Sequence, residues 1–561
     1  MTVGVREETE QQNARIPEAT RSPSRRCRGH RRDRHDRPTA ATAAPAGITG
    51  PTETYLVLFK GSASPANAAS LVKAAGGTVV ADYAKIGVLV ARSADTAFDD
   101  RMRADNKVEG ASVTTGFATE LETIATDAAQ PGDLPNAPAT DGDTFSSLQW
   151  DMRQMHTPEA HAITGGSAAV VAGTIDTGVD YRHPDLRQNI SEADSANCLS
   201  GAPVPGAAAA NDDNGHGTHT AGTIAAASNG AGIVGVAPNV RVAGIKAGNA
   251  DGYFFPEAVV CAFMWAGDRH LDVVNNSYYV DPYLFNCRND EAQRAIWKAV
   301  QRAVRYAMNR GVTIVASEGN NSEDLSHPTA DNSSPDFPAG TEEEREITNA
   351  CVVVPVEIPG VIGVTATGSF VQDTSEGDYA DNLKSYYSSF GMSTADVAAP
   401  GGDFYFRGAD PGAQAIQGQV LSTWPATIPC GRSREEATGD ASYPTAFYCG
   451  IQGTSMAGPH VAGLAALVIS RYGDPDTPQN GKMRPTQVEQ IISQTADPQA
   501  CPETLPVANA GARIGQSYET QFLGSESGAR QVCQGNGGHT SWYGQGQVDA
   551  LAAVTNDRSN G

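Results

Sequence analysis

Short apolar runs alternate with longer amphipathic stretches from Leu148 to Val554. The apolar runs are typical of strands buried on both faces, whereas the amphipathic stretches have the period of helices. This alternation predicts an α/β fold in which helices cover both faces of a parallel sheet, giving three layers. The predicted strands cover residues 170–176, 241–247, 272–277, 311–317 and 361–367, and the predicted helices cover residues 261–270, 291–310, 485–496 and the stretch after Ser455.

A smaller α+β unit is predicted from residue 54 to residue 115. Its order of strands and helices is that of a ferredoxin-like motif. The predicted strands cover residues 54–60, 78–83, 85–93 and 108–114, and the predicted helices run from Ser64 to the glycines at 76 and 77 and over residues 95–105. Residues 116–147 are rich in Pro, Ala, Gly and Asp, so we expect an exposed, cleavable linker before a large domain over residues 148–556.

The first 50 residues differ from both units because they are rich in arginine and lack the apolar segment of a signal peptide. We expect either a disordered basic tail or a wrongly assigned start at which a true signal peptide has been lost. The chain has no run of about 18 apolar residues, so no membrane span is expected.

The charge balance of the 561 residues is acidic, with 40 Lys and Arg against 64 Asp and Glu and a net charge of -24. This charge argues against a nucleic-acid partner and favours a soluble protein that repels its own copies. We therefore expect a monomer.

Eight of the nine cysteines lie outside the basic start of the chain, and their spacing fits no zinc motif. Disulfides are the favoured interpretation, with Cys430–Cys449 and Cys501–Cys533 as local pairs, and buried free thiols are the alternative. Disulfides would place the chain in an oxidising compartment, and we expect it to be secreted.

The stretch Gly453–Val468 reads GTSMAGPHVAGLAALV, a tight turn that runs into an apolar helix. Pro459 predicts a first helical turn, because proline lacks the N–H that later turns use. Ser455 is therefore expected at a helix N-terminus, where unpaired N–H groups suit a nucleophile whose attack builds an oxyanion. Serine needs a base and an orienting carboxylate to act in this way.

Two upstream motifs offer these groups. Asp176 ends an apolar strand in TIDTGVDYRHPDL, and His216 stands between two glycines at the start of a small-residue helix in NGHGTHTAGTIAAA. Taken singly, Asp176 could be an ordinary turn residue, and His219 is interpreted as structural. A zinc site is not expected, because the HExxH spacing and its Glu are absent.

A third motif, GVTIVASEGNN, ends a strand at Gly319 and Asn320. An amide at this place can donate a hydrogen bond to an oxyanion. Asp176, His216 and Ser455 follow one another in the order that subtilisin uses, and the serine turn is not the GxSxG elbow of α/β-hydrolases.

Together these motifs resemble those of the subtilisin-like serine proteases (subtilases, peptidase S8), over roughly Gln149–Val554. The resemblance implies that Asp176 orients the imidazole, that His216 is the general base and acid, and that Ser455 is the nucleophile. Asn320 would donate to the oxyanion with the backbone N–H of Ser455. It also implies a polypeptide substrate, no required cofactor, and a unit at 54–115 that acts as an inhibitory propeptide in a self-processed zymogen.

Two features depart from the family pattern or extend it. Where the family has a Ser-Leu-Gly-Gly strand beside the primary specificity pocket, this chain has Ser277, Tyr278, Tyr279 and Val280. Tyr279 is therefore expected to narrow or cover the pocket. Gly319 is expected to border the same pocket. Long inserts at 321–351 and 402–449 are expected to form disulfide-tied rims around the cleft. The resemblance also implies a structural calcium ion, with Asp185 and Asn229 among its oxygen ligands.

Two other functions remain open at this point. One is a binding protein on a decayed protease fold, which the presence of all four catalytic residue types opposes. The other is an ester or lipid hydrolase, which the absence of GxSxG and the propeptide-like unit oppose.

Overall fold

The computed structural model describes residues 49–114, 136–338, 340–371, 382–405, 418–474, 482–502, 531–536 and 538–558. The basic start of the chain and most of the expected linker lie outside these residues. Among the described helices, none combines the length and apolar character needed to cross a membrane.

The N-terminal unit has the predicted ferredoxin-like order of strands and helices. Its antiparallel sheet has the strand order β2-β3-β1-β4. Helix α1 begins at Ala68, four residues later than predicted from Ser64, because the Ser64 hydroxyl bonds Asp82 (2.6 Å) and leaves the helix uncapped there. The elements are β1 (Thr49–Phe59), α1 (Ala68–Ala74), β2 (Thr78–Tyr83), η1 (Ala84–Ile86), β3 (Val88–Asp95), α2 (Phe98–Arg103) and β4 (Val108–Thr114).

The large domain is built on one sheet in the order β16-β15-β11-β9-β5-β8-β6-β7, with β17 also paired to β15. The central pairs are parallel, as the buried apolar runs predicted. All five predicted strands are present as β5 (Val171–Asp176), β8 (Arg241–Lys246), β9 (Val273–Asn276), β11 (Thr313–Ser317) and β15 (Ile362–Val371). The other strands of the sheet are β6 (Ala196–Asn197), β7 (Val204–Pro205), β16 (Asn382–Lys384) and β17 (Val397–Pro400).

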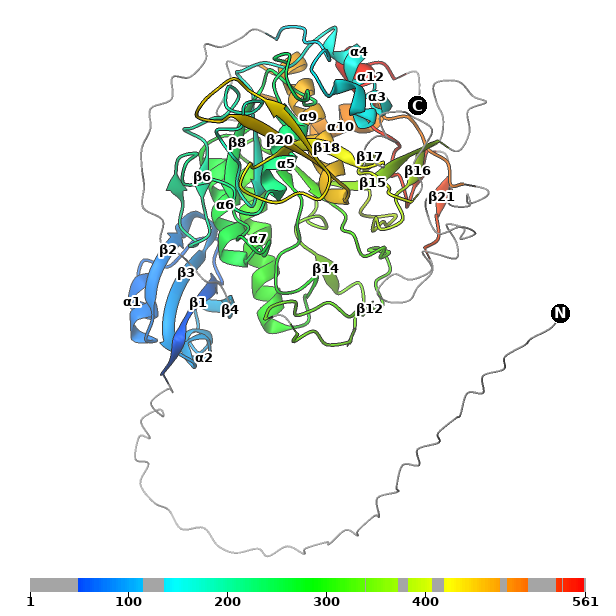
Figure 1. Ribbon diagram of the computed structural model, residues 1–561. Helices are drawn as coiled ribbons and strands as arrows, with labels where there is room; N and C mark the ends of the chain where they lie inside the picture. Colours follow the sequence, from blue (N-terminus) through cyan, green and yellow to red (C-terminus); the bar gives the residue numbers. More distant parts are fainter. Residues whose placement is uncertain are drawn as a thin grey trace, which may run out of the picture. The chain divides into compact units, whose positions relative to one another are not determined.

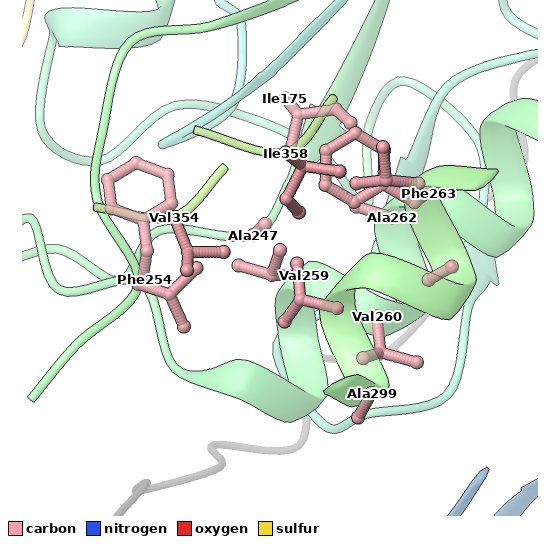
Figure 2. Close-up of a cluster of buried hydrophobic side chains, with 14 of the residues drawn as sticks. Ile175, Ala247, Phe254, Val259, Val260, Ala262, Phe263, Ala299, Val354 and Ile358 are labelled. Carbon is pink, nitrogen blue, oxygen red and sulfur yellow. The ribbon is translucent and has the colours of Figure 1, made fainter. Parts of the chain in front are cut away.

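Helices cover both faces of this sheet and give the predicted three layers (Figure 1). Neighbouring strand residues point to opposite faces, so Val274 packs with α6 and α7 while Val273 packs with α5 and α9. Figure 2 shows the first of these cores, where Phe254, Val259 and Val354 meet. The covering helices are α6 (Pro256–Asp268) and α7 (Glu291–Met308) on one face, and α5 (His216–Ala225), α9 (Thr454–Tyr472), α10 (Pro485–Gln494) and α12 (Ala550–Thr555) on the other.

Shorter elements complete the described chain and connect the layers. A three-stranded antiparallel sheet, β18-β20-β19, packs on α5, and Cys430–Cys449 ties it together. These elements are η2 (Ser146–Leu148), α3 (Trp150–Gln154), α4 (Thr157–His161), β10 (Phe285–Cys287), β12 (Ala330–Asp331), β13 (Arg345–Glu346), β14 (Cys351–Val353), β18 (Val420–Trp424), β19 (Ser433–Ala437), β20 (Thr445–Ile451), β21 (Gly535–Asn536) and β22 (His539–Thr540).

All eight cysteines outside the basic start of the chain form disulfides, which confirms the favoured interpretation of their spacing. The two predicted local pairs, Cys430–Cys449 and Cys501–Cys533, are both present. The remaining bridges are Cys198–Cys261, which joins the residue after β6 to the middle of α6, and Cys287–Cys351, which joins β10 to β14. The bridges thus fix connections that run outside the central sheet.

Candidate active site

Ser455 is the second residue of α9, so its backbone N–H lies in the first turn, where helical N–H groups have no partner within the helix. The helix is buried against the sheet along most of its length. This packing fixes the position of Ser455 at the carboxyl edge of the central strands.

The sequence predicted Pro459 in the first turn of the helix, and this prediction is wrong. Pro459 lies one turn further along α9. At this place it cannot donate to the carbonyl of Ser455, which a helical i to i−4 bond would use. The Ser277 hydroxyl donates to that carbonyl instead, at 3.0 Å. A proline inside the helix is therefore tolerated because a neighbouring strand end satisfies the freed oxygen.

Asp176 and His216 come from β5 and from the first residue of α5, and the structure brings them into contact. The His216 Nδ1 atom lies 2.8 Å from the Asp176 Oδ1 atom. The Asp176 carboxylate is fully buried and also accepts the backbone N–H of Thr177 (2.7 Å), so its orientation is fixed. The start of α5 can lie this close to the segment after β5 because residue 217 is a glycine. A Cβ at Gly217 would lie 2.1 Å from the Gly178 carbonyl oxygen.

The electrostatics of this pair favour a basic imidazole. Burial lowers the pKa of His216, but the charge of Asp176 and the hydrogen bond to it outweigh burial, and the pKa is raised above its usual value. If the Nδ1 proton is shared with Asp176, the other ring nitrogen carries the lone pair that a general base needs.

The Asn320 side chain is held by Thr454, the residue before Ser455. Its Oδ1 atom accepts the Thr454 backbone N–H at 2.9 Å and the Thr454 hydroxyl at 3.0 Å. With the oxygen held, the NH₂ group is left to donate to a substrate oxygen. Thr454 was not singled out from the sequence, although it stands directly before Ser455 in the GTS motif.

One cavity of about 410 Å³ contains His216, Asn320 and Ser455 in its wall. The four residues that the sequence assigned to substrate binding, Ser277, Tyr278, Tyr279 and Gly319, line the same cavity. The Ser455 hydroxyl donates to the Ser277 carbonyl oxygen at 3.3 Å, so it must turn toward His216 before it can transfer its proton. Hydrogen bonds of this kind often become shorter only when substrate binds.

The two tyrosines are held rigidly. The Tyr278 ring stacks on Phe254, with ring centroids 4.2 Å apart, and its hydroxyl donates to Asn276 (2.9 Å). The Tyr279 hydroxyl donates to the Asp336 Oδ2 atom at 2.6 Å. Tyr279 is therefore fixed to the insert at 321–351 as part of the cavity wall.

The two inserts differ in their relation to the cavity. The first contributes Asn321 and Asp336 to the wall, and Cys287–Cys351 ties its end to β10. No described residue of the second insert, over 402–449, lines the cavity. Instead Trp424 covers Gly215 at the start of α5, where an added Cβ would come within 2.4 Å of the indole. The described part of the second insert thus packs against the start of α5 and does not line the cavity.

His219 is structural, as interpreted from the sequence. It is buried, and its Nε2 atom faces the carbonyl oxygens of Val420 (3.2 Å) and Cys449 (3.0 Å). Burial lowers the pKa of this side chain to about 3, so it stays neutral and links α5 to the three-stranded sheet.

Asp185 and Asn229, the expected calcium ligands, are adjacent but do not fit a cation in this arrangement. The Asp185 Oδ1 atom accepts the Asn229 amide N–H at 3.1 Å. Its Oδ2 atom accepts the Tyr448 hydroxyl at 2.9 Å and the Ile233 backbone N–H at 3.1 Å. Burial raises the pKa of Asp185 to about 7. Hydrogen-bond donors therefore occupy the oxygens of this carboxyl group that a calcium ion would need.

Comparisons with known proteins agree with this geometry. A model of the subtilase family matches residues 166–540. The thermophilic serine proteinase of Bacillus sp. (strain AK1) is 30% identical over 371 residues, which are 66% of this chain and 67% of that protein. Thermitase of Thermoactinomyces vulgaris is 30% identical over 328 residues, which are 58% of this chain and 84% of thermitase.

Two solved structures share the fold. The epidermin leader peptide processing serine protease from Staphylococcus aureus superimposes with a TM-score of 0.56 at 22% identity, over 90% of this chain and 98% of that one. Fervidolysin from Fervidobacterium pennivorans superimposes with a TM-score of 0.54 at 20% identity, over 90% of this chain and 61% of the fervidolysin chain.

Proposed function

Because this chain belongs to the subtilase family and is a serine endopeptidase, we propose that Asp176, His216 and Ser455 are its catalytic triad. The observation that carries the proposal is the 2.8 Å contact between His216 and Asp176 at the edge of a cavity shared with Ser455 and Asn320. The substrate is a polypeptide, and the reaction passes through an acyl-enzyme.

In the first half of the reaction, the Ser455 oxygen attacks the carbonyl carbon of the scissile bond while its proton passes to His216. Asp176 stabilises the imidazolium that forms. The Asn320 amide and the Ser455 backbone N–H donate to the oxyanion. His216 then gives its proton to the leaving amine, and the C–N bond breaks.

In the second half, water attacks the acyl-enzyme and gives its proton to His216. The ester bond to Ser455 breaks, the proton returns to the serine oxygen, and the acid product leaves. Each step uses groups of the protein and water, and we propose no cofactor for the cycle.

Replacing Asn320 with Ala is expected to lower kcat by about 10²- to 10³-fold with little change in KM, because the amide acts on the oxyanion and not on the bound ground state. Steady-state kinetics on a peptide amide test this expectation. Asn309→Ala, at an exposed position after α7 and outside the cavity, is the matched control and should leave kcat unchanged. A loss confined to KM would contradict the assignment of Asn320.

We further propose that residues 54–115 are an inhibitory propeptide of a self-processed zymogen. The described part of this unit packs on α6 and α7, where Leu56 and Val90 join the core of the large domain. Arg302 donates to the carbonyl oxygens of Phe59 and Gly61, each at 3.0 Å. These contacts would keep the unit bound after its covalent connection is cut.

Self-processing predicts that purified full-length Ser455→Ala keeps its N-terminal region, whereas the wild-type chain loses it, since the variant lacks the nucleophile that cuts the connection. Intact mass spectrometry and N-terminal sequencing give the answer. Addition of a trace of active enzyme to the variant serves as the control for cleavage in trans. Removal of the region from the variant alone would refute self-processing.

Release of the cleaved unit is expected to depend on pH through Glu257 of α6. This side chain is 2% exposed, and burial raises its pKa to about 7 from 4.5, while the Thr114 hydroxyl and the Arg92 charge of the unit act in the opposite direction. The bound state thus favours the protonated carboxyl, so association is strongest below pH 4.5 and weakens as the pH rises to 7, by roughly ten- to a hundredfold.

Size-exclusion chromatography of the processed protein at pH 5 and pH 8 measures this release. Glu257→Gln stays neutral at both values and should remove most of the difference. An equal pH dependence in Glu257→Gln would show that another group controls release.

We also propose that the protein is secreted and acts as a monomer. The four disulfides of the described residues support an oxidising compartment.

A further inference from the structure

Two carboxylates, Asp281 and Asp336, line the same cavity as His216 and Ser455. We propose that this acidic pair makes the enzyme select polypeptides with an arginine or lysine side chain close to the cleaved bond. The inference rests on the proposed peptidase function, and it adds the chemical class of substrate.

Asp281 is held at the base of the wall. It is 4% exposed, and its carboxylate accepts the backbone N–H of Phe254. Its own N–H donates to the Phe254 carbonyl oxygen at 3.0 Å. These two backbone contacts prevent the carboxylate from swinging out of the cavity toward solvent.

Asp336 reaches the cavity from the insert at 321–351. Its backbone N–H donates to the Pro282 carbonyl oxygen at 3.0 Å, which places the insert against the segment that carries Asp281. The Oδ2 atom accepts the Tyr279 hydroxyl, whereas the Oδ1 atom is shielded from solvent and has no donor apart from a proton that Asp281 can share with Asp336. A shielded carboxylate oxygen without a donor is costly unless a ligand supplies one.

The two carboxyl groups face each other, so they cannot both be fully ionised. Burial, together with the neighbouring Asp336, raises the pKa of Asp281 well above its usual range. A proton on Asp281 therefore relieves the repulsion between the two carboxyl groups. An incoming guanidinium or ammonium group would offset the acidic pair with a positive charge and supply N–H donors to its oxygens.

The charge of the rest of the cavity wall also favours a basic side chain. The described residues that line the cavity include no Lys or Arg. Burial raises the pKa of Tyr253 at the cavity mouth, and the charges of Asp336, Asp281, Asp251 and Glu342 raise it further. The stacked rings of Phe254 and Tyr278 offer an apolar surface for the methylene stem of a long basic side chain. Charge and shape thus favour the same class of substrate.

Paired fluorogenic peptides that differ only in arginine or citrulline at one position test the proposal, since citrulline keeps the shape and loses the charge. The substituted position is moved from four residues before the cleaved bond to two residues after it. We expect the wild-type enzyme to prefer arginine by about tenfold or more in kcat/KM at one position, and this preference to fall as salt is added.

Asp336→Asn should reduce that preference to within about threefold of unity, whereas Asp336→Glu, which keeps the charge, should retain most of it. Glu435→Gln, an exposed acidic residue of β19 outside the cavity, is the matched control and should leave the preference unchanged. If Asp336→Asn does not fold, the salt dependence of the wild-type preference tests the proposal instead, and a preference that salt does not alter would overturn it.

Equal cleavage of arginine and citrulline peptides at every position would overturn the inference, as would a preference that neither salt nor Asp336→Asn alters. Cleavage of the citrulline peptides without any preference would leave the peptidase function standing. Failure to cleave either peptide of any pair would instead count against the proposed function itself.

Discussion

Replacement of Ser455 by Ala is expected to reduce kcat for a peptide amide by about 10⁶-fold. The residual activity comes from the oxyanion donors and from substrate binding. The effect is this large because the variant loses the only atom that forms the acyl-enzyme, while His216 keeps its contact with Asp176. Ser455 lies in the first turn of a buried helix, and Ala is a good helix former, so the fold should persist.

The matched control is Ser433→Ala in β19, a serine outside the cavity, which should keep full activity. Circular dichroism and thermal unfolding of both variants separate loss of chemistry from loss of structure. Peptidase activity in Ser455→Ala above about a thousandth of the wild-type value would show that another nucleophile does the work.

Asp176→Asn is expected to lower kcat by about 10⁴-fold with little change in KM. The Asp176 carboxylate accepts from both His216 and the Thr177 backbone N–H through Oδ1, and from Thr220 through Oδ2. An amide of the same shape can leave an NH₂ facing His216, which selects the wrong tautomer and provides no charge for the imidazolium.

The chain offers a close control in Asp324, whose Oδ2 atom bonds His327 Nδ1 at 2.9 Å outside the cavity. Asp324→Asn breaks the same kind of histidine–carboxylate contact and should leave kcat within about twofold. Equal effects of the two substitutions would mean that the loss in Asp176→Asn reflects general destabilisation.

The fold could be predicted well from local sequence, because the strands are short buried apolar runs whose type depends little on distant residues. The run around Val273 and Val274 illustrates this, since each residue packs with a different core and both faces must be apolar. The helix starts were less predictable. Ser64 looks like a helix cap but bonds Asp82 on a neighbouring strand.

The contacts that complete the candidate site could not be predicted, because each joins segments far apart in the chain. The Ser277 hydroxyl takes the carbonyl freed by Pro459, which allows the helix to begin earlier than its proline suggested. Tyr448 of β20 donates to Asp185, a contact that nothing near Asp185 in the sequence indicates. Asp336 stands in an insert without a motif, so only the structure places it in the cavity.

The measurement that tests the central claim most directly is covalent labelling with a serine-directed phosphonate, followed by intact mass and peptide mapping. The account predicts a single adduct on Ser455 of the processed enzyme, formed in step with loss of activity and slowed strongly by His216→Ala. An adduct on a different residue, or complete loss of activity with Ser455 unlabelled, would contradict it.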